Sequence, residues 1–326
     1  MRIIVTGGAG MIGANLVKRL VESGHEVVVL DNLWRGTLEN LQNLIKDNSL
    51  YQFVHADLSS PGEWQSYLND ADCLYHLADI VAGIGYVFSN EAYIFRKNLL
   101  INATVAMACE IANVKKYIYV GTACSFPLEL QTGLDAKPMK EEDQFPANPE
   151  SAYGWSKLMG ELDAKYMSQN GINTNVLVLH NVYGTPCDYF SEKAQAIPAI
   201  TYRALTASKT NNELVIWGDG SQGRAFVHVN DVVDALLAAI DAPSNIGPIQ
   251  IGPSVCTSLK TIAENLVQII DPSIKIKYDA TKPIGDKGRC ADYTKAKKIL
   301  NWEPKVDLHD GLTELVQWIK CKENIS

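Results

Sequence analysis

The sequence lacks several features that would define other classes of protein. It has no C-x-x-C pair, and its seven cysteines stand singly along the chain. Scattered thiols in odd number favour a reducing compartment and argue against a zinc site or a disulfide framework. There is no apolar run of the roughly 18 to 20 residues that cross a membrane, and the start, MRIIVTGG, lacks the apolar segment of a secretory signal. We therefore expect a cytoplasmic protein with neither a metal nor a membrane partner.

The sequence also has no cluster of basic residues. Its 29 lysines and arginines are outnumbered by 37 acidic residues, giving a net charge of −8. This balance argues against nucleic acid as a partner, although a few local arginines suffice to bind a pyrophosphate. With 326 residues, of which 47% are hydrophobic, the chain is long enough for a large α/β unit with a second part.

What the sequence does contain is a regular alternation of short apolar runs and amphipathic segments. The runs are RIIVT, EVVVL, YQFVHA, DCLYHLA, KYIYVG and NTNVLVL. Continuous apolar runs are typical of parallel strands covered by helices on both faces, so the pattern predicts an α/β, Rossmann-type doubly wound sheet. We predict a main domain of residues 1–182 with about 223–249, and a smaller substrate domain of 183–222 with 250–326.

The segment TGGAGMIG, directly after the first strand, predicts a dinucleotide site. Its glycines, Gly7, Gly10 and Gly13, let the backbone turn tightly and approach a pyrophosphate at the start of the next helix. Asp31 ends the second strand, where a carboxylate binds the ribose 2′-hydroxyl and favours NAD over NADP. Arg35 lies close enough in sequence to bind a 2′-phosphate, so NADP stays an alternative cofactor. The neighbouring residues expected to line the site are Met11, Ile12 and Asn32.

The segment YGWSK predicts the catalytic pair. Tyr153 and Lys157 are four residues apart, on one face of a helix, and the lysine ammonium is expected to lower the pKa of the phenol. The phenolate then takes a proton from a sugar hydroxyl as hydride leaves. Thr122, at the end of the strand KYIYVGT, is expected to hydrogen-bond the same oxygen.

Together these motifs resemble the extended short-chain dehydrogenase/reductase family that acts on nucleotide sugars. The resemblance covers essentially the whole chain and rests on motifs that occur in the family's order: TGGAGMIG, Asp31, HADL, HLAD, Thr122, YGWSK, HNVYG, GDGSQGRAFVHVND and GDKGR. It implies a Rossmann domain, an NAD that stays bound through the cycle and a nucleotide-sugar substrate. It also implies a homodimer through the helices near 90–111 and 152–169.

The resemblance assigns further residues to cofactor and substrate. The cofactor contacts it implies, besides Tyr153 and Lys157, are Asp57, Leu58, Leu77 and Ala78. The substrate contacts it implies are Gly83, Ile84, Cys124, Asn181, Lys193, Arg224 and Arg289, with the two arginines on the phosphates.

Cys124, two residues after Thr122, bears on which reaction occurs. The 4,6-dehydratases of this family have an Asp-Glu pair where this chain has Ala123 and Cys124, so dehydration lacks its acid and base. GTACSFP and LADIVAGIGYVFSN are most similar to GDP-mannose 3,5-epimerases, where a cysteine acts on a carbon beside a C4 ketone. Oxidation at C4 acidifies the C3 and C5 hydrogens, and the Cys124 thiolate can then remove one.

Two departures keep other reactions open. Those epimerases have a Lys or His acid where this chain has Gln195, and Lys193 is the nearest replacement; they also have an arginine where Val178 stands. The sequence therefore predicts an NAD-dependent epimerase acting on a GDP-hexose or GDP-heptose, with Thr122, Cys124, Tyr153, Lys157 and Lys193 as catalytic residues. A 4-epimerase, a net C4 dehydrogenase or reductase, and a non-enzymatic NAD sensor remain alternatives.

Overall fold

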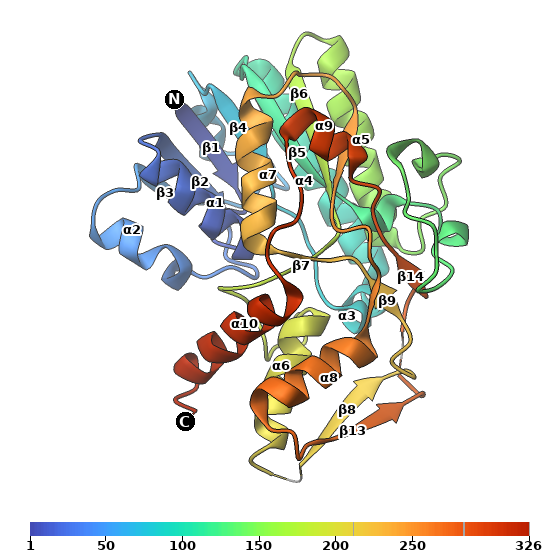
Figure 1. Cartoon of the computed structure of the whole chain (residues 1–326). Coiled ribbons are helices and arrows are strands. Elements are labelled where there is room, and N and C mark those ends of the chain that lie inside the picture. Colours follow the sequence, from blue (N-terminus) through green and yellow to red (C-terminus); the bar gives the residue numbers. More distant parts are fainter. Residues whose placement is uncertain (211, 283, 326) are drawn as a thin grey trace.

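A seven-stranded parallel sheet forms the centre of the molecule (Figure 1). The computed structural model describes residues 1–210, 212–282 and 284–325. The strands of the sheet, in its spatial order, are β11 (Pro248–Ile251), β6 (Asn173–Leu179), β5 (Lys116–Thr122), β4 (Cys73–His76), β1 (Arg2–Thr6), β2 (Glu26–Asp31) and β3 (Gln52–His55). Each apolar run singled out in the sequence coincides with one of these strands to within a residue or two at its ends, and the predicted doubly wound α/β fold is confirmed.

Helices cover both faces of this sheet. On one face α1, α7 and α9 pack side by side, and on the other α4 packs along α5. The ten α-helices of the described residues are α1 (Met11–Glu22), α2 (Gln42–Lys46), α3 (Ile84–Ser89), α4 (Glu91–Ile111), α5 (Ala152–Gln169), α6 (Ala196–Ala207), α7 (Val229–Asp241), α8 (Leu259–Ile270), α9 (Thr294–Leu300) and α10 (Leu308–Lys322).

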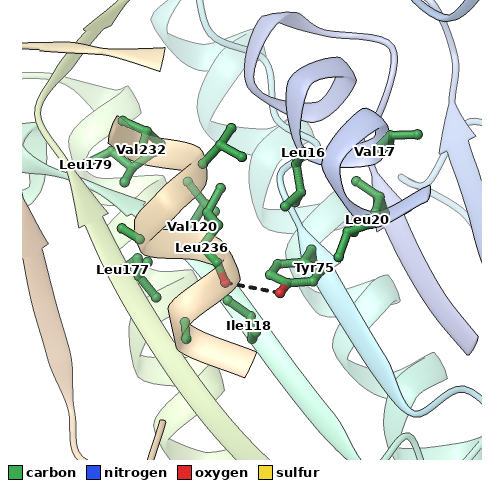
Figure 2. Close-up of a cluster of buried hydrophobic side chains, with 14 of the residues drawn as sticks. Leu16, Val17, Leu20, Tyr75, Ile118, Val120, Leu177, Leu179, Val232 and Leu236 are labelled. Atoms are coloured by element: carbon green, nitrogen blue, oxygen red, sulfur yellow. Dashed lines mark hydrogen bonds between the residues drawn. The ribbon is translucent and has the colours of Figure 1, made fainter. Parts of the chain in front are cut away.

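Alternate residues of each central strand supply two separate cores. Figure 2 shows Tyr75, Ile118 and Val120 facing α1 and α7, and the Tyr75 hydroxyl donates to the Leu236 carbonyl at 3.0 Å. The intervening residues, such as Tyr119, join the core under α4 and α5. Because successive strand residues point to opposite faces, a strand buried on both sides is apolar throughout, which is the pattern in the sequence.

A third core lies in a smaller unit built mainly from α6, α8 and α10. The strands outside the main sheet are β7 (Asn181–Tyr183), β8 (Glu213–Trp217), β9 (Gly223–Arg224), β10 (Phe226–His228), β12 (Thr257–Ser258), β13 (Lys275–Asp279) and β14 (Gly288–Arg289). They pair as β10-β7, as β12-β9-β14 and as β13-β8. The β12-β9-β14 group carries both predicted phosphate-binding arginines, on adjacent strands and in register.

The chain crosses between the two units several times. β11 spans residues 248–251 at the edge of the main sheet, and α9, at 294–300, packs on β11 and α7. β11 straddles the predicted domain boundary near residue 249, and α9 lies beyond it. The exact division of the chain into two domains stays a prediction. Among the described residues, no helix is both long and apolar enough to cross a membrane.

Candidate active site

The predicted site residues gather at the carboxyl edge of the sheet, where β1 and β4 lie side by side. Strand order reverses here, because the chain runs from β1 to β2 and β3 on one side and then returns to β4 on the other. Open α/β sheets bind ligands at such a point. A cavity of about 940 Å³ opens there and extends to the smaller unit.

Nearly every predicted residue lines this cavity. Those that do are Gly7, Gly10, Met11, Ile12, Asp31, Asn32, Leu58, Leu77, Ala78, Gly83, Ile84, Thr122, Cys124, Tyr153, Lys157, Asn181, Lys193, Arg224 and Arg289. Asp57 is not among them: its exposed carboxylate accepts from Ser59 and lies 3.3 Å from the Lys97 ammonium. The lining residues come from both units.

The glycine turn has no room for larger side chains. A Cβ on Gly13 would lie 2.3 Å from the Gly7 carbonyl oxygen, and Gly7 itself has a φ of +68°. This close approach brings the first turn of α1 against the end of β1. The backbone N–H groups at that helix start, and its dipole, suit a bound pyrophosphate.

Asp31 is held by the same turn. Its two carboxylate oxygens accept from the backbone amides of Ala9, at 2.9 Å, and Leu33, at 2.7 Å. Burial raises the pKa of this carboxyl, and the two amides act against that shift. Arg35 points elsewhere, with its Nη1 donating to the Val81 carbonyl at 3.2 Å.

The catalytic pair lies on α5, which begins after Ser151. The Ser151 hydroxyl caps the helix by accepting from the Gly154 amide at 3.3 Å. Tyr153 and Lys157 then both reach Asp79: the phenol donates to its Oδ2 at 3.1 Å, and the ammonium lies 3.3 Å from the same oxygen. Both side chains are buried. Asp79 thus joins the two groups that the sequence paired with each other.

This carboxylate changes the expected electrostatics of the phenol. Burial raises the pKa of Tyr153 well above its usual range, and Asp79 raises it further. Although burial alone lowers the pKa of Lys157, Tyr119 and Asp79 raise it overall. The expectation that Lys157 lowers the pKa of Tyr153 is therefore not met in this structure, because burial of the phenol, followed by Asp79, raises that pKa.

Cys124 lies beside an arginine. It follows Thr122 in a short 3₁₀ turn, where the Thr122 hydroxyl accepts from the Cys124 amide at 3.3 Å. The Arg289 Nη2 donates to Cys124 Sγ at 3.1 Å. This contact places a guanidinium donor directly beside the sulfur, within the same cavity.

Arg224 and Arg289 share one buried counter-ion, Asp286. Its Oδ2 accepts from Arg289 at 2.9 Å. Its Oδ1 lies 2.9 Å from Arg224 Nη1 without the geometry of a hydrogen bond, so that contact is Coulombic. Burial lowers the pKa of Arg224; for Arg289 burial acts the same way, but Asp286 and Cys124 raise it overall. Arg289 also lies 3.5 Å from the Asn181 side-chain oxygen, which brings two predicted substrate contacts together.

Behind Thr122 lies a second buried carboxyl, Glu161. Its oxygens accept from Gln144 at 2.7 Å and from Ser125 at 3.1 Å. Burial raises its pKa to about 7, against these hydrogen bonds. Glu161 does not line the cavity, so it supports the Thr122 turn from behind.

Lys193 lines the cavity but is engaged elsewhere. Its ammonium donates to the Trp34 carbonyl at 2.9 Å and lies 4.3 Å from the centre of the Trp34 ring. The Lys193 carbonyl accepts from the Gly83 amide at 3.2 Å, which ties this loop to the other predicted substrate residues. To serve Cys124 as an acid, Lys193 has to leave Trp34.

Sequence reasoning missed Asp79, Asp286 and Glu161. Asp79 and Asp286 stand inside the quoted segments HLAD and GDKGR. The available signals were an acidic residue just beyond the fourth strand and one three residues before Arg289. Glu161 stands four residues after Lys157 on α5, on the buried side of the helix.

The fold and the cavity define an enzyme that binds a dinucleotide at the turn after β1 and a second ligand between the two units. The chain belongs to the NAD dependent epimerase/dehydratase family, whose sequence profile matches residues 3–252. NAD is thus the cofactor, and the predicted family is confirmed.

Similar proteins agree on the family and differ in substrate. GDP-mannose 3,5-epimerase 1 of Oryza sativa subsp. indica is 30% identical over 323 residues, which is 98% of this chain and 82% of that protein. UDP-glucuronic acid decarboxylase 1 of Arabidopsis thaliana is 31% identical, over 97% of this chain and 69% of that protein. The crystal structure of UDP-glucose 4-epimerase from Thermotoga maritima, solved with UDP-glucose, superposes with a TM-score of 0.88 at 28% identity. That match covers 99% of this chain and all of the other. Enzymes of GDP- and of UDP-sugars are thus similarly close.

Proposed function

We propose that this enzyme is a nucleotide-sugar epimerase that oxidises the sugar transiently at C4 and uses Cys124 as a base at C3 or C5. The observation that carries the proposal is the contact between Cys124 Sγ and Arg289 in the same cavity as Tyr153 and Lys157. An enzyme that only moved hydride at C4 would not need a cysteine beside the Thr122 turn.

The residues that would hold NAD fit it. The turn at Gly7 and Gly13 leaves space only for backbone, and Asp31 keeps lone pairs for a ribose hydroxyl after accepting two amides. Lys157 would hydrogen-bond the nicotinamide ribose. When bound, NAD accepts the hydride from C4 and later returns it.

The chain's own residues move the protons. Tyr153 takes the proton of the C4 hydroxyl as its own phenolic proton passes to Asp79, and Lys157 and Thr122 orient the substrate oxygen. The resulting ketone acidifies the neighbouring C–H bonds, and the Cys124 thiolate removes one. A proton returned to the opposite face inverts that carbon, and hydride returned to C4 leaves no net oxidation. Lys193 is our candidate for the acid, released from Trp34 when the sugar enters.

Substrate binding follows from the arginines. Arg224 and Arg289 would bind the diphosphate, and Asn181, Gly83 and Ile84 would contact the sugar. The similarity to GDP-mannose 3,5-epimerase along 98% of the chain favours a GDP-linked hexose or heptose.

A simple 4-epimerase is the second candidate, and one observation favours it. Lys193 is fixed on Trp34 and Gln195 cannot donate a proton as an acid, so a thiolate without a partner would leave C3 and C5 unchanged. A net C4 oxidase or reductase is a third.

We also propose a homodimer through α4 and α5. Exposed apolar residues recur on one face of α4 at Tyr93, Leu100, Met107 and Ile111, and the last two are 61% and 76% exposed. Their spacing of seven and four residues places them on one stripe of the helix. Because exposure of such an apolar stripe to water is unfavourable, we expect a second copy of the chain to bury it in a dimer interface.

The test is a thermal-shift screen of GDP-, UDP-, CDP- and dTDP-sugars with the NAD-loaded enzyme, followed by NMR of the product. The strongest ligand should raise the melting temperature most and be converted to an isomer inverted at C3 or C5. A C4-inverted product would establish the 4-epimerase instead, and a stoichiometric change in absorbance at 340 nm would establish net redox. If sugars bind and none is converted, the remaining alternative is a non-enzymatic NAD sensor.

A further inference from the structure

Asp79 places a carboxylate at the nicotinamide end of the cavity. It lies three residues beyond the end of β4, between the glycine turn after β1 and Thr122 at the end of β5. Its Oδ2 accepts from Tyr153 and pairs with Lys157, and its side chain is 12% exposed. The two groups expected to touch the nicotinamide ribose are therefore both in contact with this one anion.

The charge of Asp79 acts against the charge of Lys157. A buried ammonium beside the nicotinamide repels the oxidised ring, which is a cation, and has no such effect on the neutral reduced ring. Alone, Lys157 would favour the reduced cofactor. A carboxylate at 3.3 Å from the ammonium offsets that effect.

We propose that Asp79 adjusts the cofactor's redox balance, favouring bound NAD⁺ over bound NADH. In the oxidation half, one hydride leaves C4 for the ring, which loses its positive charge. One proton leaves the hydroxyl for Tyr153, whose own phenolic proton passes to Asp79. Asp79 makes this loss less favourable and the return of hydride to the ketone more favourable. An enzyme that ends each cycle with oxidised cofactor requires that return.

This inference uses the part of the proposed function that places the nicotinamide beside Lys157. It does not depend on the sugar or on Cys124. Its test is therefore carried out without substrate, and it can fail while the epimerase proposal stands, or hold when that proposal fails.

The experiment compares the dissociation constants of NAD⁺ and NADH for the full chain and for Asp79→Asn. NADH binding is followed by fluorescence and NAD⁺ binding by competition with it. The ratio of the two constants should shift toward NADH by roughly tenfold or more in the variant, because the Lys157 ammonium then has no carboxylate to offset its repulsion of the oxidised ring. The matched control is Asp31→Asn, which removes a carboxylate from the other end of the cofactor and should weaken both forms alike.

An unchanged ratio in Asp79→Asn would overturn the proposal, and so would an equal shift in Asp31→Asn. A role in positioning Tyr153 and Lys157 alone would change both affinities together and leave the ratio constant. If Asp79→Asn does not fold, Asp79→Ser is measured in its place. Where NAD remains bound through purification, the reduced fraction at 340 nm, after equilibration with a redox couple of known potential, gives the same comparison.

Discussion

Replacing Asp286 by asparagine removes the anion that lies between two buried guanidinium groups. Asp286 is 4% exposed and contacts both Arg224 and Arg289 at 2.9 Å. Gln131 also accepts from Arg289, at 3.0 Å, so Arg289 keeps one neutral acceptor in the variant. Two positive charges then face each other with less compensation, and both the cost of burial and their repulsion increase.

The expected loss in the free energy of unfolding is about 3 kcal/mol. Removing one partner of a buried ion pair costs about 3–5 kcal/mol, and the asparagine oxygen retains part of the hydrogen bonding. For a chain of this size such a loss lowers the melting temperature by roughly 4–5 °C. The same change should strengthen the binding of a nucleoside diphosphate, because the ligand's phosphates no longer compete with a carboxylate for the arginines.

The assay is thermal unfolding with and without GDP or UDP. The variant should melt lower without ligand and gain more from the nucleotide than the wild type does. Asp310→Asn, an exposed carboxylate at the start of α10, is the control and should stay within about 0.5 kcal/mol of the wild type. Equal stability of Asp286→Asn and wild type, or an equal gain from the nucleotide, would refute the view that Asp286 compensates a phosphate site.

Three further predictions concern other parts of the structure. Because burial raises the pKa of Glu161 to about 7, its contribution to stability is complete below about pH 4.5 and is lost as the pH rises through about 7. Over that range the free energy of unfolding of Glu161→Gln should increase by on the order of 3 kcal/mol relative to that of the wild type. Urea unfolding at each pH measures this, and parallel pH curves for the two proteins would contradict it. Tyr153→Phe should slow reduction of bound NAD by sugar roughly 10²–10⁴-fold, followed at 340 nm, while NAD binding persists; an unchanged rate would exclude Tyr153 as the C4 base. Charge on the α4 stripe, as in Leu100→Glu with Met107→Glu, should convert a dimer to monomers by light scattering, and a dimer that survives both changes must use another surface.

Much of the fold followed from local sequence. The strands were recognisable because each is buried on both faces, and the dinucleotide turn because a glycine, a helix start and Asp31 stand at fixed spacing. Tyr153, Lys157 and Thr122 were found for the same reason, since each follows an element boundary that the sequence marks.

The contacts among the charged residues of the site could not be predicted from local sequence. Asp79 contacts Tyr153 across 74 residues of chain, and Asp286 joins arginines from β9 and β14, which pair only in the folded protein. The orientation of Lys193 toward Trp34 likewise depends on how a loop of one unit meets the other. Spacing along the chain carries no information about such contacts. The predicted effect of Lys157 on the Tyr153 pKa therefore took no account of burial or of Asp79, both of which raise that pKa.

The central claim is that Cys124 performs proton chemistry on a carbon next to a transient C4 ketone. It is tested most directly by incubating the substrate with wild type and with Cys124→Ala in deuterium oxide and reading deuterium at each sugar carbon by NMR. We expect deuterium at C3 or C5 with the wild type, and none with Cys124→Ala although that variant still reduces its bound NAD. Deuterium uptake that is the same in both proteins, or absent in both while C4 inverts, would contradict the account.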